Sequence, residues 1–230
     1  AVDLSGHGDS AHRERYDIET WTEEVMAAAV HGGIEGRPVV IGHSMGGFVT
    51  IATAARHCDD LGGVIVVDSP VREPDPEVES ARLKEAFGAP RTYPAVDDGL
   101  ARFRTIPEQA HYLDYVMDHV GRRSLKAVDG GVQWKFDRRV FEQFDERIRA
   151  LGMPYLAQVT CRFALLRAEH GLVTPDIGAA MYDVLGRVAP VIELPEAGHH
   201  PMLDVPLVLL TAIRTLLADW DHSEPHRRAP

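Results

Sequence analysis

Cysteine is scarce in this chain, which has only Cys58 and Cys161 among its 230 residues. Two cysteines cannot form the disulfide framework of a small secreted domain, so we expect a reducing compartment and a cytoplasmic location. An excess of positive charge is also missing, because 35 acidic residues outnumber 24 basic ones and give a formal net charge of −11. This balance argues against nucleic acid or an anionic membrane as the partner, since both favour a basic surface.

Long apolar runs and cofactor motifs are absent as well. No stretch approaches the roughly 20 apolar residues of a membrane-spanning helix. The sequence holds no Walker loop, no dinucleotide-binding glycine pattern and no Cys/His metal spacing, so we expect neither a cofactor nor a metal. The rest of the composition, 45% hydrophobic and 26% charged, is typical of a globular protein that buries a large core.

Strand and helix patterns alternate at both ends of the chain. Apolar, β-branched runs predict buried strands at 39–42, 63–70, 161–169 and 189–195, and the end of a further strand at 1–4. Helical patterns are found at 20–30, 45–57, 174–188 and 207–220. Such alternation predicts an α/β fold with a mostly parallel sheet flanked by helices.

The middle of the chain differs from both ends. Residues 71–151 are charged, show a helical pattern and are interrupted by prolines. A length of about 80 residues exceeds what a simple crossover between strands needs. We therefore expect a helical insertion at 71–151, with residues 1–70 and 152–222 forming the core. The tail 223–230 lacks apolar periodicity, and we expect it to be disordered.

The motif Gly42-His43-Ser44-Met45-Gly46 lies between the strand at 39–42 and a helix of small residues. Its glycines allow the tight turn of a nucleophile elbow, which exposes the serine. The same turn brings the backbone N–H of Met45 near the reacting carbonyl. We predict that Ser44 is a nucleophile, with a glycine turn that carries no chemistry as the alternative. A serine hydroxyl also needs a base that takes its proton.

Two of the twelve histidines are candidates for that base. His199 and His200 follow a predicted strand and Gly198, and they precede the last helix, which predicts a loop at the carboxyl edge of the sheet. The chain order of this type of triad, serine then acid then histidine, also requires the histidine to come last. The alternative is a pair of surface loop histidines. His43, beside the serine, is expected to support the elbow rather than to act as the base.

Three stretches carry a resemblance to a known family: "VDLSGHGDS" near the start, "GHSMGG" at the elbow and "EAGHHPMLDVP" near the end. With them the chain resembles the α/β-hydrolase superfamily, in its esterase- and lipase-like branch with a helical cap. The resemblance covers roughly 1–70 and 155–220. It implies that Ser44 is the nucleophile, that His199 is the base with His200 as second choice, and that the insertion is a cap over the substrate pocket.

Relatives of this kind begin with further strands and a His-Gly loop that supplies a second oxyanion donor. We therefore expect the chain to be N-terminally truncated, with the N–H of Met45 as the one donor that the sequence identifies. Loss of one such donor typically lowers turnover by on the order of 10²–10³.

The triad acid is less clear from the resemblance. In most relatives it lies three residues past a glycine-like position held here by Ala168, and that place is Gly171, which has no carboxylate. Glu169 is close to it in sequence. Asp68 ends the strand that follows the elbow, where some relatives have their acid. We favour Asp68, with Glu169 as the alternative acid and a turn-capping role as the alternative for Asp68.

The predicted function is hydrolysis of a carboxylic ester by Ser44, His199 and Asp68 through an acyl-enzyme, with the N–H of Met45 stabilising the oxyanion. The resemblance implies a carboxylesterase-like serine hydrolase that needs no cofactor and acts on a small-molecule ester or related acyl substrate. Carbon–carbon bond hydrolysis and cofactor-free perhydrolase or haloperoxidase activity are alternatives with the same triad. A non-catalytic ligand-binding protein on this scaffold is a further alternative. The oligomeric state stays open, with a homodimer among the options.

Overall fold

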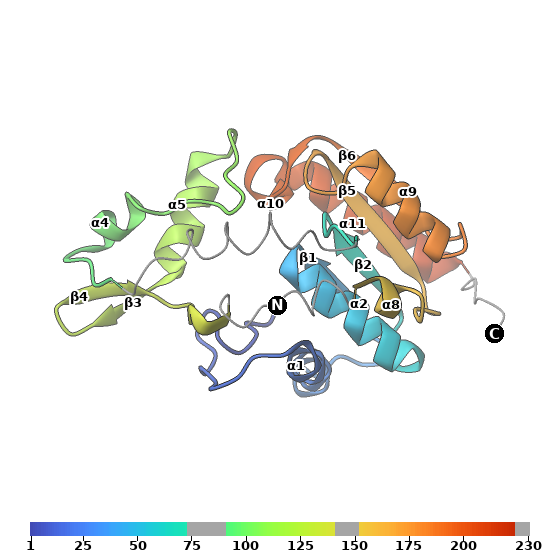
Figure 1. Cartoon of the computed structure of the whole chain (residues 1–230), viewed down its shortest axis with the longest axis horizontal. Helices are drawn as coiled ribbons and strands as arrows, with labels where there is room; N and C mark the ends of the chain where they lie inside the picture. The colour runs from blue at the N-terminus through green and yellow to red at the C-terminus, as the bar shows by residue number, and fades with distance from the viewer. Residues whose placement is uncertain (73–90, 141–151, 224–230) are drawn as a thin grey trace. The chain divides into compact units, whose positions relative to one another are not determined.

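The computed structural model describes residues 1–72, 91–140 and 152–223 (Figure 1). The chain divides into two compact units. The hairpin unit consists of Ala1–Asp17 and Asp75–Asp145, and the sheet unit consists of Ile18–Pro74 and Glu146–Pro230. Parts of the predicted cap, 73–90 and 141–151, and residues 224–230 of the predicted tail lie outside the described residues.

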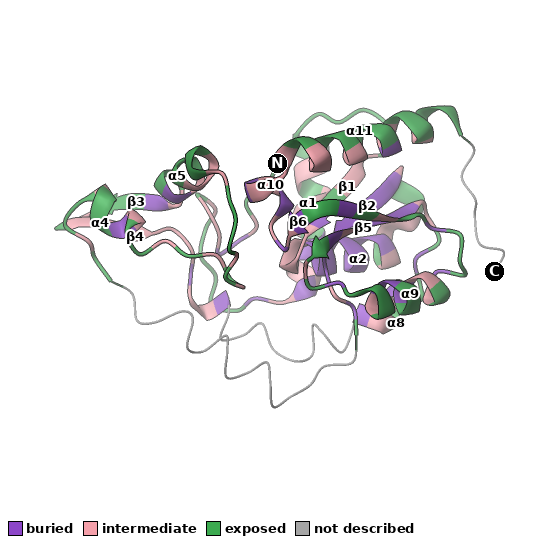
Figure 2. Ribbon diagram, turned by 90° about the horizontal axis from the view of Figure 1, so that it is seen from above, coloured by how far each residue is buried: buried purple, intermediate pink, exposed green. Residues whose placement is uncertain are grey.

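The sheet unit is built on a four-stranded parallel sheet in the order β1-β2-β5-β6. Its strands are β1 (Val39–His43), β2 (Gly63–Val67), β5 (Phe163–His170) and β6 (Val191–Gly198). Every residue of β2 is buried, and Figure 2 shows this strand in the buried colour between its neighbours. Parallel strands that are covered on both faces are nearly continuous apolar runs, which explains why "GVIVV" forms a central strand. The predicted α/β class and parallel sheet are confirmed.

Helices cover both faces of this sheet. In the sheet unit they are α1 (Ile18–His31), α2 (Met45–His57), the short 3₁₀ turn η1 (Cys58–Asp60), α8 (Gly152–Leu156), α9 (Pro175–Val184), α10 (Pro201–Asp204) and α11 (Pro206–His222). The apolar side of α11 packs on a cluster that includes Ile65 and Val67. The start of α2 packs near Val66 instead. Since successive side chains of a strand point to opposite faces, α2 and α11 lie on opposite sides of the sheet.

None of the helices in the described part of the chain combines the length and the apolarity that crossing a bilayer requires.

The hairpin unit corrects the expectation of a purely helical insertion. It contains α4 (Val96–Leu100), α5 (Asp114–Arg123), β3 (Leu125–Val128) and β4 (Gly131–Trp134), and the two strands pair antiparallel. Asp129 and Gly130 link them, and Gly130 has φ 80°. An Asp-Gly loop suits the positive φ that a two-residue hairpin turn requires. This pair within "VDGGV" was the signal that the helical interpretation overlooked.

The first 17 residues belong to the hairpin unit, although the sequence analysis placed them in the core. Residues 1–4 form no strand. The buried Asp137 explains their attachment, because its carboxylate accepts a hydrogen bond from the Tyr16 hydroxyl (2.8 Å) and its N–H donates to the Gly6 carbonyl (2.7 Å). These bonds join the first segment to the residues after the hairpin. A cap role for this unit stays a prediction.

Candidate active site

The elbow forms where the sequence predicts it. Strand β1 ends at His43 and helix α2 begins at Met45, so that Ser44 alone makes the turn between them. Ser44 has φ 53° and ψ −118°, a conformation that L-residues rarely adopt and that costs on the order of 1–3 kcal/mol. Its N–H donates to the Val67 carbonyl (3.1 Å), which ties the turn to β2. The serine side chain is thereby held at the carboxyl edge of the sheet.

The glycines of the motif have unequal importance. A Cβ at Gly42 would lie 2.2 Å from the Gly46 carbonyl oxygen, and one at Gly47 would lie 1.9 Å from Ser69 Oγ. A Cβ at Gly46 meets no described atom within 4 Å. Close packing of α2 against the two strands therefore depends on Gly42 and Gly47. The Ser69 hydroxyl, which sequence reasoning missed, donates to the Ser44 carbonyl (2.9 Å) and supports the turn from β2.

Three of the predicted site residues form one chain of hydrogen bonds. His199 Nε2 lies 2.9 Å from Ser44 Oγ, and His199 Nδ1 lies 2.8 Å from Asp68 Oδ2. Ser44 follows β1, Asp68 follows β2 and His199 follows β6, so all three lie at the carboxyl ends of parallel strands. Asp68 is fully buried and His199 is 3% exposed, which keeps water away from the contact between them.

The Asp68 carboxylate is held by backbone groups near the end of β5 and in the loop after it. Oδ1 accepts the N–H groups of Ala168 (3.1 Å) and Val173 (3.2 Å), and Oδ2 accepts the N–H of Leu172 (2.8 Å). Burial alone would raise the pKa of Asp68, but the hydrogen bonds from His199 and from the backbone outweigh it and lower the pKa below the usual value. The residue therefore stays ionised and fixed in one orientation. Its φ of 44° is a second strained conformation at this edge.

The structure shows why Gly171 carries no acid. A Cβ at Gly171 would lie 2.2 Å from Asp68 Oδ2, so the Asp68 carboxylate fills the space that a side chain at 171 would enter. Glu169, the alternative acid, is exposed, and its carboxylate accepts the N–H of Glu196 (2.8 Å). The carboxylate that accepts the hydrogen bond of His199 Nδ1 is that of Asp68.

His43 supports the histidine loop. Its Nε2 lies 2.6 Å from the His199 carbonyl oxygen, which can only accept, so His43 carries its proton on Nε2. Burial first, and then the neighbouring His199, lower the pKa of His43 to about 4. The ring is therefore neutral at physiological pH and fixes the His199 backbone without adding a charge beside it.

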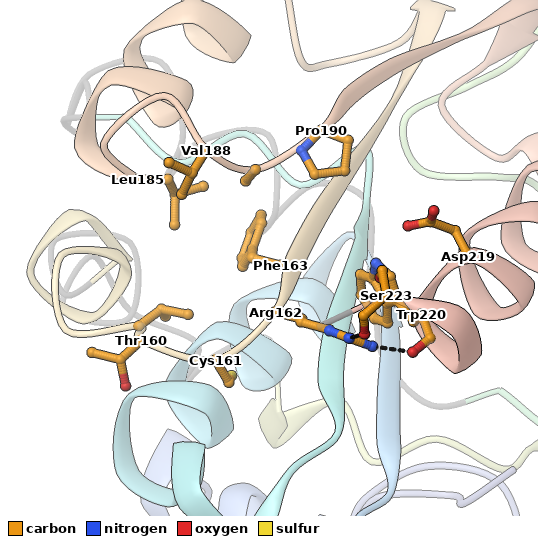
Figure 3. A pocket seen from close by; sticks show the side chains of 12 residues that line it. Thr160, Cys161, Arg162, Phe163, Leu185, Val188, Pro190, Asp219, Trp220 and Ser223 are labelled. Carbon is orange, nitrogen blue, oxygen red and sulfur yellow. Dashed lines mark hydrogen bonds between the residues drawn. The ribbon is translucent and has the colours of Figure 1, made fainter. Parts of the chain in front are cut away.

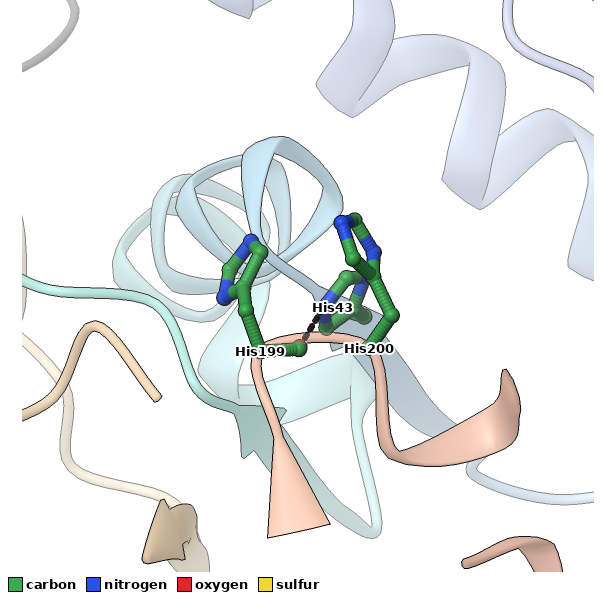
Figure 4. A group of neighbouring side chains, drawn as sticks. All are labelled: His43, His199 and His200. Carbon is green, nitrogen blue, oxygen red and sulfur yellow. Dashed lines mark hydrogen bonds between the residues drawn. The ribbon is translucent and has the colours of Figure 1, made fainter. Parts of the chain in front are cut away.

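His200 completes a group of three imidazoles (Figure 4). The ring centroids of His199 and His200 are 4.6 Å apart, and those of His43 and His200 are 5.3 Å apart. One nitrogen from each of the three rings falls within 4.8 Å of the others, which makes them the candidate metal ligands among the described residues. The sequence alone did not predict this group, because His43 is far from the other two histidines along the chain. The histidine that lies between Ser44 and Asp68 is His199, whose Nε2 faces the Ser44 hydroxyl and whose Nδ1 faces the Asp68 carboxylate, and not the second-choice His200.

Met45 is the first residue of α2. The first N–H groups of a helix have no partner within it, and they point toward the positive end of the helix dipole. The N–H of Met45 is therefore a donor directly beside Ser44. Hydrogen-bond donors in such a place can stabilise negative charge that develops on a substrate oxygen.

Comparison with known proteins gives consistent matches. The profile of the alpha/beta hydrolase family matches residues 1–212. The 2-(acetamidomethylene)succinate hydrolase of Mesorhizobium japonicum is 24% identical over 221 residues, which cover 94% of this chain and 77% of that protein. The crystal structure of an E-2-(acetamidomethylene)succinate hydrolase superposes with a TM-score of 0.82 at 21% identity, over 95% of this chain and 80% of that one.

Two relatives from Mycobacterium tuberculosis are similar over the same share of this chain, 94%. Lipase LipV is 25% identical over 222 residues, which cover 82% of its length. Esterase Rv0045c is 27% identical over 238 residues, which cover 73% of its length. The three relatives reported are thus named as a hydrolase, a lipase and an esterase.

Proposed function

Because the chain belongs to the alpha/beta hydrolase family, we propose that it is a serine hydrolase that cleaves a carboxylic ester through an acyl-enzyme intermediate. Membership of the family, which the three sequence motifs predicted, is confirmed. The catalytic roles are part of the proposal. Ser44 is the nucleophile, His199 the general base and Asp68 the acid that orients it.

The hydrogen-bond chain from Ser44 through His199 to Asp68 is the observation that carries the proposal. Ser44 Oγ bonds to the ester carbonyl carbon while His199 Nε2 takes its proton, and the N–H of Met45 faces the oxyanion. The alcohol leaves with the proton from His199. A water molecule then gives a proton to His199, attacks the acyl carbon and releases the carboxylic acid and Ser44.

A protein that only binds a ligand has little use for this arrangement. Ser44 and Asp68 both have positive φ, and a buried carboxylate requires desolvation, so the site lowers stability. Strain of this kind persists where positioned chemical groups depend on it. These features support an enzyme over a non-catalytic ligand-binding protein.

The substrate class follows from the relatives. A lipase and an esterase among them support ester hydrolysis over carbon–carbon bond hydrolysis and over perhydrolase or haloperoxidase chemistry. We propose a small-molecule ester or related acyl compound as the substrate. The compound 2-(acetamidomethylene)succinate belongs in any test panel, because the relative named for its hydrolysis covers most of this chain.

The test is turnover of a panel of nitrophenyl esters, thioesters and 2-(acetamidomethylene)succinate. Ser44→Ala should lower ester turnover by on the order of 10⁶, the loss seen when a triad serine is removed. Ser223→Ala, a serine at the end of α11 and away from the triad, is the matched control and should keep full activity. Ester turnover that survives Ser44→Ala in the folded protein would overturn the proposal.

A further inference from the structure

The two cysteines, distant in sequence, meet at the edge of the sheet opposite the triad. Cys58 directly follows α2 as the first residue of η1, and the start of α2 follows Ser44. Cys161 lies just before β5, whose far end leads to the loop that holds Asp68. Neither forms a disulfide, and both are partly exposed. The two residues are in direct contact, because the backbone N–H of Cys161 donates to the sulfur of Cys58.

Backbone N–H groups converge on one of the two sulfurs. Cys58 Sγ accepts the N–H of Thr160 (3.1 Å) and the N–H of Cys161 (3.2 Å). Successive N–H groups in a turn form a concave site that favours an anion. The thiol of Cys161 first, and then the donors from Thr160, lower the pKa of Cys58 to about 5 against the opposing effect of burial. These direct bonds outweigh the C-terminal end of the α2 dipole, which disfavours a thiolate.

A reagent can reach this sulfur through a cavity of about 230 Å³. Arg37 and Arg162 line it together with Cys58, Cys161 and Asp59. Figure 3, which draws a neighbouring pocket, shows the Arg162 side chain extending away from Cys161 to the end of α11, where the carbonyl groups of Trp220 and Ser223 accept hydrogen bonds from its guanidinium. Arg37 and Asp59 thus line the same cavity as the two cysteines, whereas the guanidinium of Arg162 is bound at the end of α11.

We propose that Cys58 and Cys161 form a peroxide-reactive pair in which Cys58 is the attacking thiolate and Cys161 resolves the product to a disulfide. The proposal does not rest on the hydrolase activity. The sulfur of Cys58 attacks one oxygen of hydrogen peroxide, the O–O bond breaks, and the other oxygen leaves as hydroxide, which takes up a proton from solvent. Cys161 sulfur then attacks the Cys58 sulfenic acid, loses its proton and expels water. The net reaction converts two thiols and hydrogen peroxide to one disulfide and two waters.

Cys161 suits the second step because its own ionisation depends on Cys58. The hydrogen bond with Cys58 is the largest cause that raises the pKa of Cys161, followed by burial. Oxidation of Cys58 to the sulfenic acid removes the negative charge, and with it the main obstacle to ionisation of Cys161. The resolving thiol therefore becomes a better nucleophile when it is needed.

The pH dependence of alkylation tests the thiolate in the wild-type protein. Nucleophilicity falls as the pKa of a thiol falls, so the rate at neutral pH separates this pair poorly from ordinary cysteines. The midpoint of the pH profile does separate them. Iodoacetamide should modify Cys58 with a midpoint below that of an ordinary thiol, because the pKa of Cys58 is lowered, and with a plateau at neutral pH. A midpoint above about 8, that of an ordinary thiol, would overturn the assignment of Cys58 as the thiolate.

Peroxide treatment tests the pairing. Equimolar hydrogen peroxide should remove two hydrogen atoms from the intact mass, abolish both free thiols and link the Cys58 and Cys161 peptides, and dithiothreitol should reverse this. Cys161→Ser should stop at a dimedone-trapped sulfenic acid on Cys58, and Cys58→Ser should trap none. A disulfide between two chains, or a wild-type mass that gains oxygen without a crosslink, would overturn the resolving role of Cys161.

Discussion

Replacing Asp68 by asparagine separates the two roles of the triad carboxylate, its shape and its charge. Oδ1 accepts two backbone N–H groups, whereas Oδ2 accepts one backbone N–H and faces His199 Nδ1. If the amide nitrogen took the place of Oδ1, it would face two backbone N–H groups, and donors cannot bond to one another. In the place of Oδ2 it would face only one backbone N–H group. The introduced amide therefore turns its NH₂ toward His199, which must accept with Nδ1 and carry its proton on Nε2. That tautomer cannot take the proton of Ser44.

The expected loss follows from this tautomer. Asp68→Asn should lower ester turnover by about 10⁴, which corresponds to about 5.4 kcal/mol in activation free energy, while the fold is retained. Stopped assays with a nitrophenyl ester over a range of pH would measure kcat and KM, and circular dichroism would check the fold. Glu169→Gln is the matched control and should change turnover by about tenfold or less, because an exposed charge is screened by solvent. Near-normal turnover of Asp68→Asn beside a crippled Glu169→Gln would refute the reasoning.

Three further sets of variants probe the contacts around the triad and around Asp137. The double variant Asp68→Gly with Gly171→Asp should recover at least about tenfold over Asp68→Gly alone in ester turnover, since a side chain at 171 enters the space of the lost carboxylate; no recovery would show that the 171 backbone cannot direct an acid to the base. Ser69→Ala should lower the free energy of unfolding by about 1–2 kcal/mol in urea titration, because its buried hydroxyl supports the Ser44 carbonyl; an unchanged stability would contradict this. Burial alone would raise the pKa of Asp137, but hydrogen bonds from an arginine and a tyrosine outweigh burial, and the pKa falls from 3.8 to about 2. Asp137→Asn should therefore cost about 1–2 kcal/mol at neutral pH, and the difference from wild type should vanish as the pH falls from 3.8 toward 2, because the native carboxylate is then protonated; a difference that persists at low pH would rule out ionisation as its source.

Local patterns predicted the parts of the site that depend on neighbouring residues. The elbow could be placed because Gly42 and the small side chains of α2 permit one particular strand-to-helix turn, and α2 covers the predicted 45–57. His199 could be selected because chain order and the preceding strand put it at the correct edge. These features need no knowledge of distant contacts.

Contacts between distant segments account for the misses. Asp68 and Glu169 could not be separated from the sequence, because the choice depends on which carboxylate meets the backbone after β5. No local pattern marks Ser69, because the partner of its hydroxyl is the carbonyl group of the distant Ser44. Residues 1–4 have strand-like composition, but the hydrogen bonds around Asp137 hold the first segment in the hairpin unit.

Covalent labelling of Ser44 tests the central claim most directly. A fluorophosphonate should react with the wild-type protein at one site, and peptide mapping should locate the adduct on Ser44 within "GHSMGG". Asp68→Asn should be labelled far more slowly, since its His199 cannot accept the serine proton. An adduct on a different residue, or no adduct in a folded protein that still hydrolyses esters, would contradict the account.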